Sequence, residues 1–324
     1  MIYAWPNVVV VGQRRSHDHR RYANNGCRAR GAGEEMTQNF SPAICNSLLI
    51  TGGTGSLGRA FARHALESGV QRVCIFSRGE HTQEDMRQEF GNDRRLRFFI
   101  GDVRDQPRLR RAMEGCGIIV HAAALKTIQA GFYNPSEMVK TNILGAINVI
   151  EAAHDAYVQK VVAISSDKAY QAISPYGQSK ALAESLFIAA DYARGRLGPR
   201  FAVCRYGNVA GSRGSVIPKW QELISAGATW VPITDPECTR FYMKMSEAAE
   251  LVGNTINTMN GGELVIPELP AYRLGDLAEA MGVEYKVTGL PQYEKLHECM
   301  ADGNCSNTAR RMSVTELKEE VGRV

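Results

Sequence analysis

Short apolar runs alternate with longer amphipathic stretches from about residue 45 to residue 205. The runs are rich in Val, Ile, Leu and Phe, which is typical of strands buried in a parallel sheet. Strands that alternate with helices indicate an α/β fold with a Rossmann-type, doubly wound parallel sheet. The expected strands are 47–51, 72–77, 96–101, 117–122, 161–165 and 201–205, and the expected helices are 59–68, 82–90, 106–114, 134–156 and 177–194.

The pattern becomes less regular after residue 205. We expect loops around 211–216 and 230–240, a helix over 272–281, and a structural role for the tail after 306. A chain of 324 residues holds two or three domains at roughly 100–200 residues each. We therefore expect one domain over 45–205 and a smaller C-terminal domain over 206–324.

Residues 1–40 do not follow the alternating pattern. Residues 11–40 are rich in Arg, Asn, Gly and Ser and have neither helical nor strand periodicity. Asn7–Gly12 resembles the first strand of a Rossmann fold, but no glycine-rich turn follows it. We therefore expect residues 1–40 to be a disordered N-terminal extension that does no chemistry, with the body beginning near Met36. An arginine-rich transit peptide is the alternative.

Composition excludes several classes of protein. With 44% hydrophobic and 22% charged residues, the chain has an ordinary globular composition. No run approaches the roughly 18 apolar residues of a membrane span. The net charge is only +4, and positions 1–35 carry six arginines against three acidic residues. Because the rest of the chain is nearly balanced, nucleic acid is not expected as a partner.

The eight cysteines are scattered along the chain, without a CxxC pair. This spacing indicates reduced cysteines in a cytoplasmic protein, and it predicts neither a disulfide framework nor a zinc site. His17-Asp18-His19 is interpreted as part of a solvated polar tail and not as a metal motif. No metal site is therefore predicted.

A glycine-rich turn, Gly52–Gly58 (GGTGSLG), stands between strand 47–51 and helix 59–68. Its glycines allow a tight turn and let backbone N–H groups approach a pyrophosphate at the start of the helix. Three glycines alone are weak support, but here both flanking elements are of the right kind. The turn predicts a dinucleotide-binding site.

The second strand ends in Ser77-Arg78, about 20 residues after the glycine turn. Proteins that bind NAD place an acidic residue there, whereas a guanidinium and a hydroxyl suit the 2′-phosphate of NADP. We therefore expect domain 45–205 to bind NADP, with an exposed arginine at a strand end as the alternative. Small residues at Ala122 and Ala123 would let the cofactor lie against the backbone.

Strand 161–165 is followed by Ser166, Asp167 and Lys168, and Tyr176 and Lys180 come on the next helix. Because residues i and i+4 lie on one helix face, Lys180 can approach the phenol of Tyr176. A nearby ammonium and a positively charged nicotinamide lower the pKa of a tyrosine from about 10 towards neutrality. Tyr176 is therefore predicted to act as a general base on a sugar hydroxyl.

These motifs resemble those of a known family from about Leu48 to Met300. The chain is similar to extended short-chain dehydrogenases/reductases that modify nucleotide sugars. More narrowly, it resembles the inverting UDP-N-acetylglucosamine 4,6-dehydratases (C-5 epimerising) of pseudaminic-acid biosynthesis, within the polysaccharide biosynthesis protein family. Simple epimerases and plain reductases usually lack the adjacent Asp167 and Lys168. The matching segments are TGGTGSLG (51–58), SRGE (77–80), RFFIGDVRD (97–105), HAAALK (121–126), YNP (133–135), KTN (140–142), SDKA (166–169), YGQSK (176–180), RYGNVAGSRGSV (205–216), PITD (232–235), TRF (239–241) and EKLHE (294–298).

The resemblance implies a redox-neutral dehydration. Tyr176, with Lys180 and Ser166, would remove the proton of the C-4 hydroxyl as hydride passes to NADP. Lys168 would take the C-5 proton, provided that burial keeps its amine partly neutral. Asp167 would protonate the departing C-6 hydroxyl. Hydride then returns to C-6, and C-5 is protonated on the opposite face.

The resemblance also implies a UDP-N-acetylhexosamine substrate, a homo-oligomer, and no nucleic-acid or membrane partner. The implied cofactor-binding residues are Gly52, Thr54, Gly55, Ser56, Leu57, Gly58, Ser77, Arg78, Gln83, Asp102, Val103, Ala122, Ala123, Lys126, Tyr176, Lys180 and Val209. The implied substrate-binding residues are Lys126, Asn208, Arg213, Arg240 and Glu294. Domain 206–324 is thereby expected mainly to bind substrate.

Two other functions stay open at this point: a C-4 or C-3 epimerase on the same fold, and a non-catalytic NADPH-sensing Rossmann protein. The intact Ser166, Tyr176 and Lys180 count against the sensor. One departure from the family concerns the substrate, because Pro291–Tyr293 (PQY) stands where the family has Arg-Pro-Gly. The loss of a charged hydrogen bond typically costs about 1.5–3 kcal/mol. The exact sugar nucleotide and the C-5 stereochemistry are therefore left open.

Overall fold

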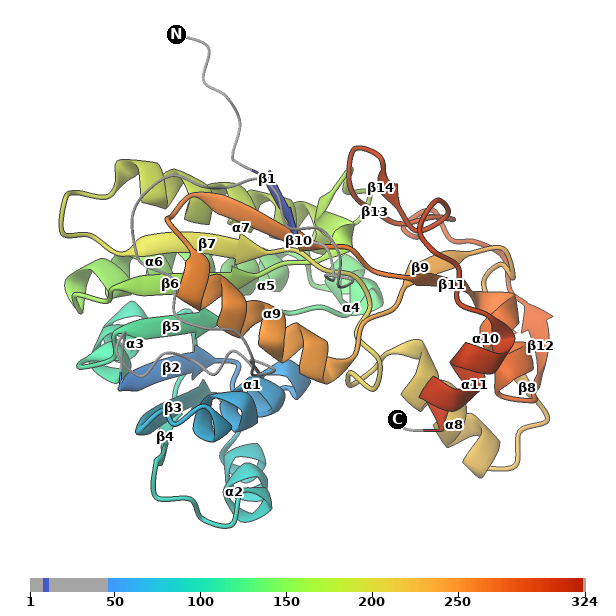
Figure 1. Ribbon diagram of the computed structural model, residues 1–324, viewed down its shortest axis with the longest axis horizontal. Helices are drawn as coiled ribbons and strands as arrows, with labels where there is room; N and C mark the ends of the chain where they lie inside the picture. The colour runs from blue at the N-terminus through green and yellow to red at the C-terminus, as the bar shows by residue number, and fades with distance from the viewer. Residues whose placement is uncertain (1–7, 12–45, 323–324) are drawn as a thin grey trace, which may run out of the picture.

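A parallel sheet forms the centre of the larger part of the molecule (Figure 1). The computed structural model describes residues 8–11 and 46–322. The sheet has eight strands in the order β1-β10-β7-β6-β5-β2-β3-β4, which confirms the predicted Rossmann-type fold. The strands are β1 (Val8–Val11), β2 (Ser47–Thr51), β3 (Arg72–Ser77), β4 (Leu96–Ile100), β5 (Ile118–His121), β6 (Lys160–Ile164), β7 (Arg200–Cys204) and β10 (Glu263–Pro267).

Helices cover both faces of this sheet. Helix α1 packs against α9 on one face, and α3, α6 and α7 lie on the other (Figure 1). The apolar strands bury both of their faces between these two layers, which gives one continuous core. The helices are α1 (Ser56–Glu67), α2 (Glu80–Glu89), α3 (Gln106–Met113), α6 (Gly145–Asp155), α7 (Pro175–Ala193) and α9 (Met245–Thr258).

The helix predicted over 134–156 is confirmed as a continuous helical run over 135–155, which contains one π-helical turn. Helices α4 (Ile128–Tyr133) and α5 (Pro135–Met138) come first, and a π-helical turn, Val139–Leu144, then leads into α6. Pro135 starts a new helix because a proline fits the first helical position. The π-helical turn inserts an extra residue, as such turns often do at functional sites.

A second, smaller core lies beyond residue 205. It contains α8 (Val216–Ser225), α10 (Leu274–Ala280) and α11 (Val314–Val321). The prediction of a loop over 230–240 is partly wrong, because β8 (Trp230–Ile233) and β9 (Thr239–Phe241) lie there. Each is extended because it pairs with a distant strand: β8 with β12 (Glu284–Val287) and β9 with β11 (Ala271–Arg273).

The chain returns to the large sheet after residue 205. Helix α9 and strand β10 belong to the first core, although they lie in the range predicted for the C-terminal domain. The first core therefore contains residues from both sides of position 205. The division of the chain at that position, into a cofactor-binding and a substrate-binding part, stays a prediction.

The expectation that residues 1–40 are a disordered extension is wrong for Val8–Val11. These residues form β1, which pairs in parallel with β10 at the edge of the sheet. The edge of β10 presents backbone N–H and C=O groups, and a run of β-branched valines readily adopts the conformation that pairs with them. The four valines remain 42–48% exposed. The other residues of this range lie outside the described residues.

The prediction that all cysteines are reduced is also wrong. Cys299 and Cys305 form a disulfide across the hairpin of β13 (Cys299–Ala301) and β14 (Asn304–Cys305). The antiparallel pairing places the two residues opposite each other, with their Cα atoms 4.0 Å apart. Sequence spacing alone does not reveal this hairpin. The free cysteines among the described residues are Cys74, Cys116, Cys204 and Cys238, and all four are buried.

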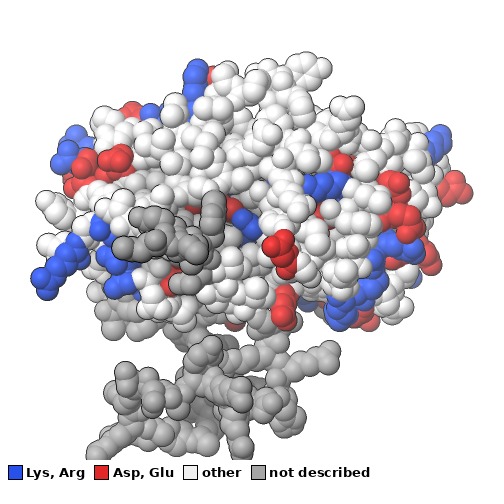
Figure 2. Space-filling model, turned by 90° about the horizontal axis from the view of Figure 1, so that it is seen from above, with Lys and Arg blue, Asp and Glu red and all other residues white. Residues whose placement is uncertain are grey.

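Surface charge is mixed on the face seen in Figure 2, where basic and acidic side chains lie among one another towards the margins. Across residues 8–11 and 46–322, none of the helices combines the length and the apolar character that a membrane crossing requires. The first and last described elements lie in different parts of the molecule: β1 at the edge of the sheet and α11 in the second core (Figure 1).

Candidate active site

The glycine turn lies against the end of the neighbouring strand β5. Gly52 has a φ of +66°, and its N–H donates to the carbonyl of Phe76 at 2.8 Å. A Cβ atom at Gly52 would lie 2.8 Å from the backbone of Ala123, and one at Gly58 would lie 2.4 Å from the carbonyl oxygen of Gly53. Only glycine fits these positions. The turn therefore leaves room for a pyrophosphate beside the backbone.

The first turn of α1 continues this cradle. Its N-cap residue is Gly55, which has no side chain to bond the first helical N–H groups. These N–H groups point out of the start of the helix, where an anion can bind. Thr54 lies in the turn, and Ser56 and Leu57 begin the helix. The hydroxyl of Ser56 accepts a hydrogen bond from the backbone N–H of Arg213 at 3.0 Å.

The ends of β3 and β4 are held together by Gln83. Its side-chain amide donates to the carbonyl and the hydroxyl of Ser77 at 3.1 and 3.0 Å, and to the carbonyl of Phe99 at 3.0 Å. Gln83 and Ser77 are buried, whereas Arg78 is exposed beside them. Arg78 is thus free to meet a phosphate that arrives from solvent.

Asp102 and Val103 follow strand β4. The carboxylate of Asp102 accepts from the backbone N–H of Arg104 at 3.0 Å, so it stabilises the turn in which it lies. Val103 is buried, and a Cβ atom at Gly145 would lie 2.9 Å from its side chain. Val209 is also buried, in a bridge with Met243.

Asn142, in the π-helical turn, was not among the predicted site residues. Its side chain accepts from the N–H of Leu125 at 2.8 Å and donates to the carbonyl of Leu125 at 2.9 Å. It also donates to the hydroxyl of Ser179, on helix α7, at 2.9 Å. Asn142 therefore ties the loop after β5 to the helix that carries Tyr176 and Lys180. The KTN segment (140–142) is the signal that pointed to it.

The predicted catalytic residues converge at the carboxyl end of β6. Ser166 donates to Asp167 Oδ1 at 2.8 Å and is hydrogen-bonded to the Tyr176 hydroxyl. Ser174 caps helix α7 by accepting from a backbone N–H, and this cap fixes where the helix that carries Tyr176 begins. Asp167 is 1% exposed. The carboxyl ends of parallel strands are the usual place for ligands in such sheets.

Lys180 bonds the backbone at the end of β6 and is not among the main causes of the Tyr176 pKa shift. Its ammonium donates to the carbonyl of Ile164 at 2.5 Å. Burial is the largest effect on Tyr176 and raises the pKa of its phenol, against the opposing effects of Lys168 and the Ser166 hydroxyl. Burial also lowers the pKa of Lys180 to about 8, and Glu184 opposes this shift. The predicted lowering of the Tyr176 pKa also involves the charge of the nicotinamide and stays a prediction.

Lys168 is not partly neutral, which corrects an expectation. Burial acts to lower the pKa of Lys168, but Asp167 and Glu298 together outweigh it and raise that pKa. Its Nζ atom lies 3.2 Å from Asp167 Oδ1 and 3.3 Å from Glu298 Oε1. The side chain is therefore an ammonium between two carboxyl groups. Glu298 ends the EKLHE segment, but it was not predicted as a site residue.

Arg240 and Glu294 form an ion pair at 2.5 Å. The Arg240 guanidinium also donates to the carbonyls of Thr239 and Leu296 at 2.7 and 3.1 Å, and the residue is buried. Asn208, a third predicted substrate contact, is hydrogen-bonded to the side chain of Tyr272. These contacts place all three residues near the EKLHE segment or the second core.

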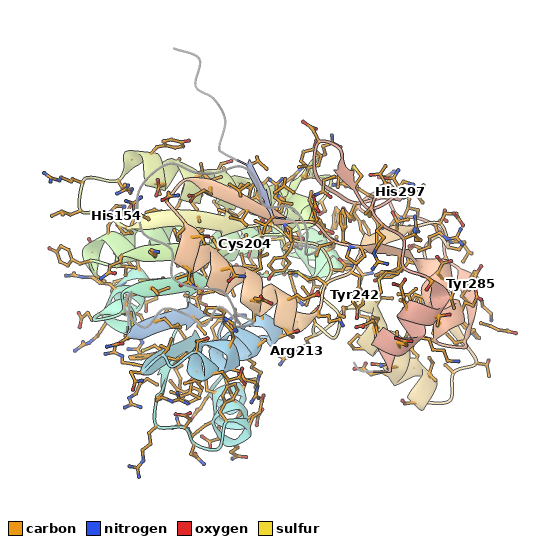
Figure 3. All side chains as sticks on the ribbon, viewed as in Figure 1. His154, Cys204, Arg213, Tyr242, Tyr285 and His297 are labelled. Carbon is orange, nitrogen blue, oxygen red and sulfur yellow. A yellow bond between two sulfur atoms is a disulfide. The ribbon has the colours of Figure 1, made fainter. Side chains whose placement is uncertain are left out.

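Three cations approach one another where the two cores meet. The pKa of Lys126 is lowered, first by burial and then by the charges of Arg213 and Lys219. Arg213 lies between the large sheet and the second core, near the start of α1 (Figure 3). Within residues 8–11 and 46–322, none of the three has an ion-pair partner. An anionic ligand would supply the missing negative charge. Lys219, on α8, was not predicted.

The segment that replaces the family triplet provides an aromatic ring. Tyr293 packs against Phe132 of α4, with ring centroids 5.0 Å apart. Phe132 remains 47% exposed. The neighbouring Glu294 is the residue paired with Arg240. A partly exposed aromatic pair therefore stands beside the predicted substrate contacts, where the resemblance implies an arginine.

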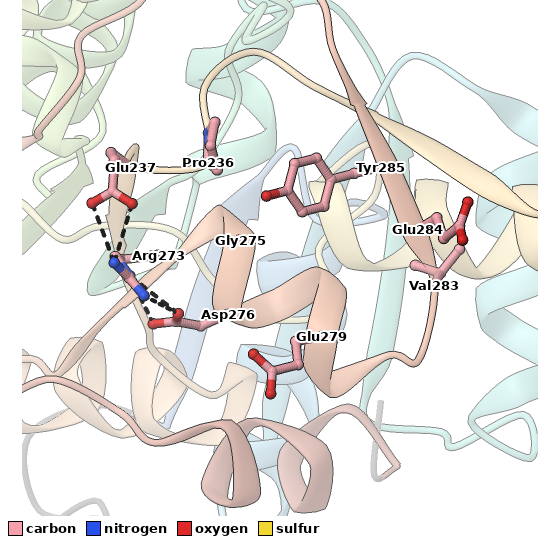
Figure 4. A pocket seen from close by; sticks show the side chains of 9 residues that line it. All are labelled: Pro236, Glu237, Arg273, Gly275, Asp276, Glu279, Val283, Glu284 and Tyr285. Atoms are coloured by element: carbon pink, nitrogen blue, oxygen red, sulfur yellow. Dashed lines mark hydrogen bonds and ion pairs between the residues drawn. The ribbon is translucent and has the colours of Figure 1, made fainter.

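A cavity of about 510 Å³ opens elsewhere, on the smaller core (Figure 4). None of the predicted site residues lines it. Arg273 lies between Glu237 and Asp276 and is paired with both, as the dashed lines in Figure 4 show. The convergence of reactive side chains, and not the size of this cavity, therefore defines the candidate site.

A doubly wound sheet with a glycine turn and a Ser-Tyr-Lys group at the ends of its strands defines the short-chain dehydrogenase/reductase class. A family model described as polysaccharide biosynthesis protein matches residues 48–318. The chain belongs to that family. This finding confirms the resemblance predicted from the motifs.

Two curated relatives illustrate the similarity. UDP-N-acetylglucosamine 4,6-dehydratase (inverting) of Campylobacter jejuni is 43% identical over 264 residues, which cover 81% of this chain and 79% of the relative. UDP-glucose 4-epimerase of Rickettsia rickettsii is 41% identical over 242 residues, which cover 74% of this chain and 70% of the relative. Relatives of similar identity thus carry the names of a dehydratase and of an epimerase.

Solved structures show the same architecture. The structure of Pen from Bacillus thuringiensis superposes with a TM-score of 0.82 at 32% identity and covers 87% of this chain and 99% of that one. DesIV from Streptomyces venezuelae, a dTDP-glucose 4,6-dehydratase solved with NAD and TYD, gives a TM-score of 0.73 at 21% identity. It covers 85% of this chain and 96% of its own. At that identity, the likeness to DesIV supports the fold alone.

Proposed function

We propose that this protein is a nucleotide-sugar 4,6-dehydratase that acts on a UDP-N-acetylhexosamine, inverts C-5 and retains NADP between turnovers. The observation that carries the proposal is the buried group at the end of β6, where Asp167, Lys168 and Tyr176 lie together. An epimerase needs the tyrosine but has no leaving hydroxyl to protonate. The pair Asp167-Lys168 supplies the additional acid–base chemistry that dehydration requires.

The residues of the glycine turn fit a dinucleotide. Gly52–Gly58 and the first turn of α1 would hold the pyrophosphate, with Ala122 and Ala123 against the ring system. Ser77 and Arg78 would contact the 2′-phosphate, which supports NADP over NAD. When bound, the nicotinamide supplies a hydride acceptor at C-4 of the sugar and a hydride donor at C-6.

Tyr176 would remove the proton from the C-4 hydroxyl. It can do so as a phenolate, a state that the charge of Lys168 and the hydrogen bond with Ser166 both favour against burial. Lys180 holds the carbonyl at the end of β6 and so fixes the helix face that presents Tyr176. The resulting C-4 ketone makes the C-5 proton acidic.

Asp167 and Lys168 would carry out the elimination. Asp167 gives its proton to the departing C-6 hydroxyl, so that the C–O bond breaks and water leaves. Lys168 is the proposed acceptor of the C-5 proton, once its partly exposed ammonium has released to solvent the proton that it holds at rest. Protonation of C-5 on the opposite face then inverts that centre.

The cations where the two cores meet would hold the diphosphate. Lys126 and Arg213 are predicted contacts, and Lys219 joins them from α8. Asn208, Arg240 and Glu294 would contact the rest of the sugar nucleotide from the side of the second core. Charge-assisted hydrogen bonds of this kind are the strong ones in phosphate recognition.

Product mass tests this proposal against its rival. We expect incubation with UDP-N-acetylglucosamine to give a 4-keto-6-deoxy product that has lost one water. The relative from Rickettsia rickettsii is named UDP-glucose 4-epimerase, so epimerisation is the second candidate. Epimerisation leaves the mass of the sugar nucleotide unchanged. A product of unchanged mass and altered C-4 configuration would overturn the dehydratase proposal. A Tyr176→Phe control should give neither product.

A further inference from the structure

Two buried carboxyl groups share one ammonium in the candidate site. Lys168 Nζ lies 3.2 Å from Asp167 Oδ1 and 3.3 Å from Glu298 Oε1. Both acids are almost completely buried, at 1% and 2% exposure. Among the described residues, Lys168 is the cation that pairs with both acids, and one ammonium compensates one carboxylate. The acid with fewer other cations around it is therefore expected to keep its proton.

The remaining surroundings of the two acids differ. Glu298 Oε2 lies 3.7 Å from the ammonium of Lys295. The positive charge of the Arg240 guanidinium also lowers the pKa of Glu298. Asp167 has, besides Lys168, only the hydroxyl of Ser166, which donates to Oδ1. Asp167 Oδ2 and Glu298 Oε2 are both buried without a hydrogen-bond partner, but only Glu298 Oε2 has a second ammonium nearby, that of Lys295 at 3.7 Å. More cations therefore surround Glu298 than Asp167, so Glu298 is expected to be the ionised acid.

The directions of the two pKa shifts agree with this geometry. Burial raises the pKa of Asp167, and the opposing effect of Lys168 does not cancel it. Burial also acts to raise the pKa of Glu298, but Lys168, Arg240 and Lys295 outweigh it and lower that pKa. Neighbouring carboxyl groups whose pKa values are pushed apart are a mark of assigned acid and base roles.

We propose that Glu298 is a positioning residue that provides the counter-charge of Lys168 and thereby leaves Asp167 protonated for the elimination step. The inference rests on the proposed dehydratase function. In that step Lys168, as a free amine, takes the C-5 proton, and the electrons of the C-5–H bond form the C-5=C-6 double bond. The Asp167 proton forms a bond with the departing C-6 oxygen, the C-6–O bond breaks and water leaves. Asp167 is then a carboxylate beside the ammonium of Lys168, which stabilises it.

Glu298→Gln tests the inference, because it removes the charge and keeps the shape. Lys168 then has only Asp167 as its counter-ion, so the Asp167 pKa falls and the acid loses its proton at neutral pH. We expect dehydration to drop at least tenfold at neutral pH and to recover as the pH is lowered, since each unit of pKa changes the ionisation ratio tenfold. Oxidation at C-4 precedes this step, so bound NADP should still be reduced on mixing with substrate.

Two further variants keep the test decisive. Glu298→Asp preserves the charge and should keep the wild-type pH profile, even if a shorter side chain lowers the rate. In Asp167→Asn the side chain is an amide, which cannot donate an acidic proton at any pH. The loss of dehydration in this variant should therefore not recover in acid. NADP reduction by nicotinamide absorbance and product by mass spectrometry are measured for each variant across pH.

The outcomes separate the two claims. A wild-type enzyme that yields no dehydrated sugar overturns the proposed function and this inference with it. Wild-type dehydration together with a Glu298→Gln pH profile like that of the wild type overturns the inference alone. A folded Glu298→Gln protein that also fails to reduce NADP overturns it too, because Glu298 would then act before the elimination.

Discussion

At the scale of residues, the acid–base group around Lys168 determines what the site can do. The residue is 21% exposed at its side chain, yet two carboxyl groups hold it as an ammonium. The sequence predicted Asp167 and Lys168 because they are adjacent. It did not predict Glu298, which reaches the same ammonium only because the EKLHE segment folds back onto the end of β6.

Lys168→Met is expected to abolish dehydration while dinucleotide binding persists. Removal of one partner from a buried ion pair costs about 3–5 kcal/mol of unfolding free energy. Glu298 would then keep only Lys295 and Arg240 as nearby cations, so its pKa should rise. The loss of stability should therefore shrink as the pH falls and Glu298 takes up a proton. Denaturant unfolding at two pH values measures this. An equal stability loss at both values would contradict the account.

Arg78→Asp is expected to shift the cofactor preference from NADP to NAD. The exposed guanidinium is the group proposed to meet the 2′-phosphate, and its loss should weaken NADP binding at least tenfold, about 1.4 kcal/mol. Calorimetric titration with both dinucleotides measures the ratio of affinities. Arg110→Asp, an exposed change on α3, serves as the matched control. An unchanged ratio in Arg78→Asp would show that the 2′-phosphate lies elsewhere.

At the scale of elements, the π-helical turn connects the two halves of the candidate site. Asn142→Ala would leave the N–H and carbonyl of Leu125 without their side-chain partner. A buried polar group left unsatisfied costs about 1–3 kcal/mol, so unfolding free energy and kcat should both fall. Asn148→Ala removes one bond, to the carbonyl of Val103, from a partly exposed position on α6 and should cost less. Equal costs in the two variants would argue against this role.

The N-terminal strand is expected to matter for stability more than for chemistry. Deletion of residues 1–35 removes β1, which pairs only with β10 at the sheet edge. Its hydrogen bonds contribute about 0.5–1.5 kcal/mol each, and ordering its backbone opposes them by about 1–2 kcal/mol per residue. Because these two contributions nearly offset each other, we expect unchanged activity and a change in Tm of no more than a few degrees. A large loss of activity would show that the segment contributes to the site.

Elements with local signals could be predicted from the sequence, and those that depend on distant pairing could not. Strands β2 to β7 and helices α1 to α3 lie within about two residues of their predicted bounds, because apolar runs and the glycine turn mark them. The π-helical turn within the helix over 134–156 was not predicted, and its Asn142 accepts a hydrogen bond from the N–H of Leu125, which is a tertiary contact. Strand β1 and the Cys299–Cys305 hairpin are likewise fixed by partners far along the chain or by turn geometry.

At the scale of the whole molecule, the site is formed where the large sheet and the second core meet. The glycine turn and β6 supply the dinucleotide cradle and the acid–base group, and residues beyond 205 supply Arg213, Lys219 and Glu298. The chemistry therefore depends on both parts of the chain. Assembly into a homo-oligomer stays a prediction of the family resemblance.

The reaction of the whole enzyme with UDP-N-acetylglucosamine in heavy water tests the central claim most directly. The account predicts a product that has lost one water, carries deuterium at C-5 and has inverted configuration there, as read by mass spectrometry and NMR. Deuterium enters because the C-5 proton is removed and replaced from solvent during inversion. A product of unchanged mass, or a dehydrated product without C-5 deuterium, would contradict the account.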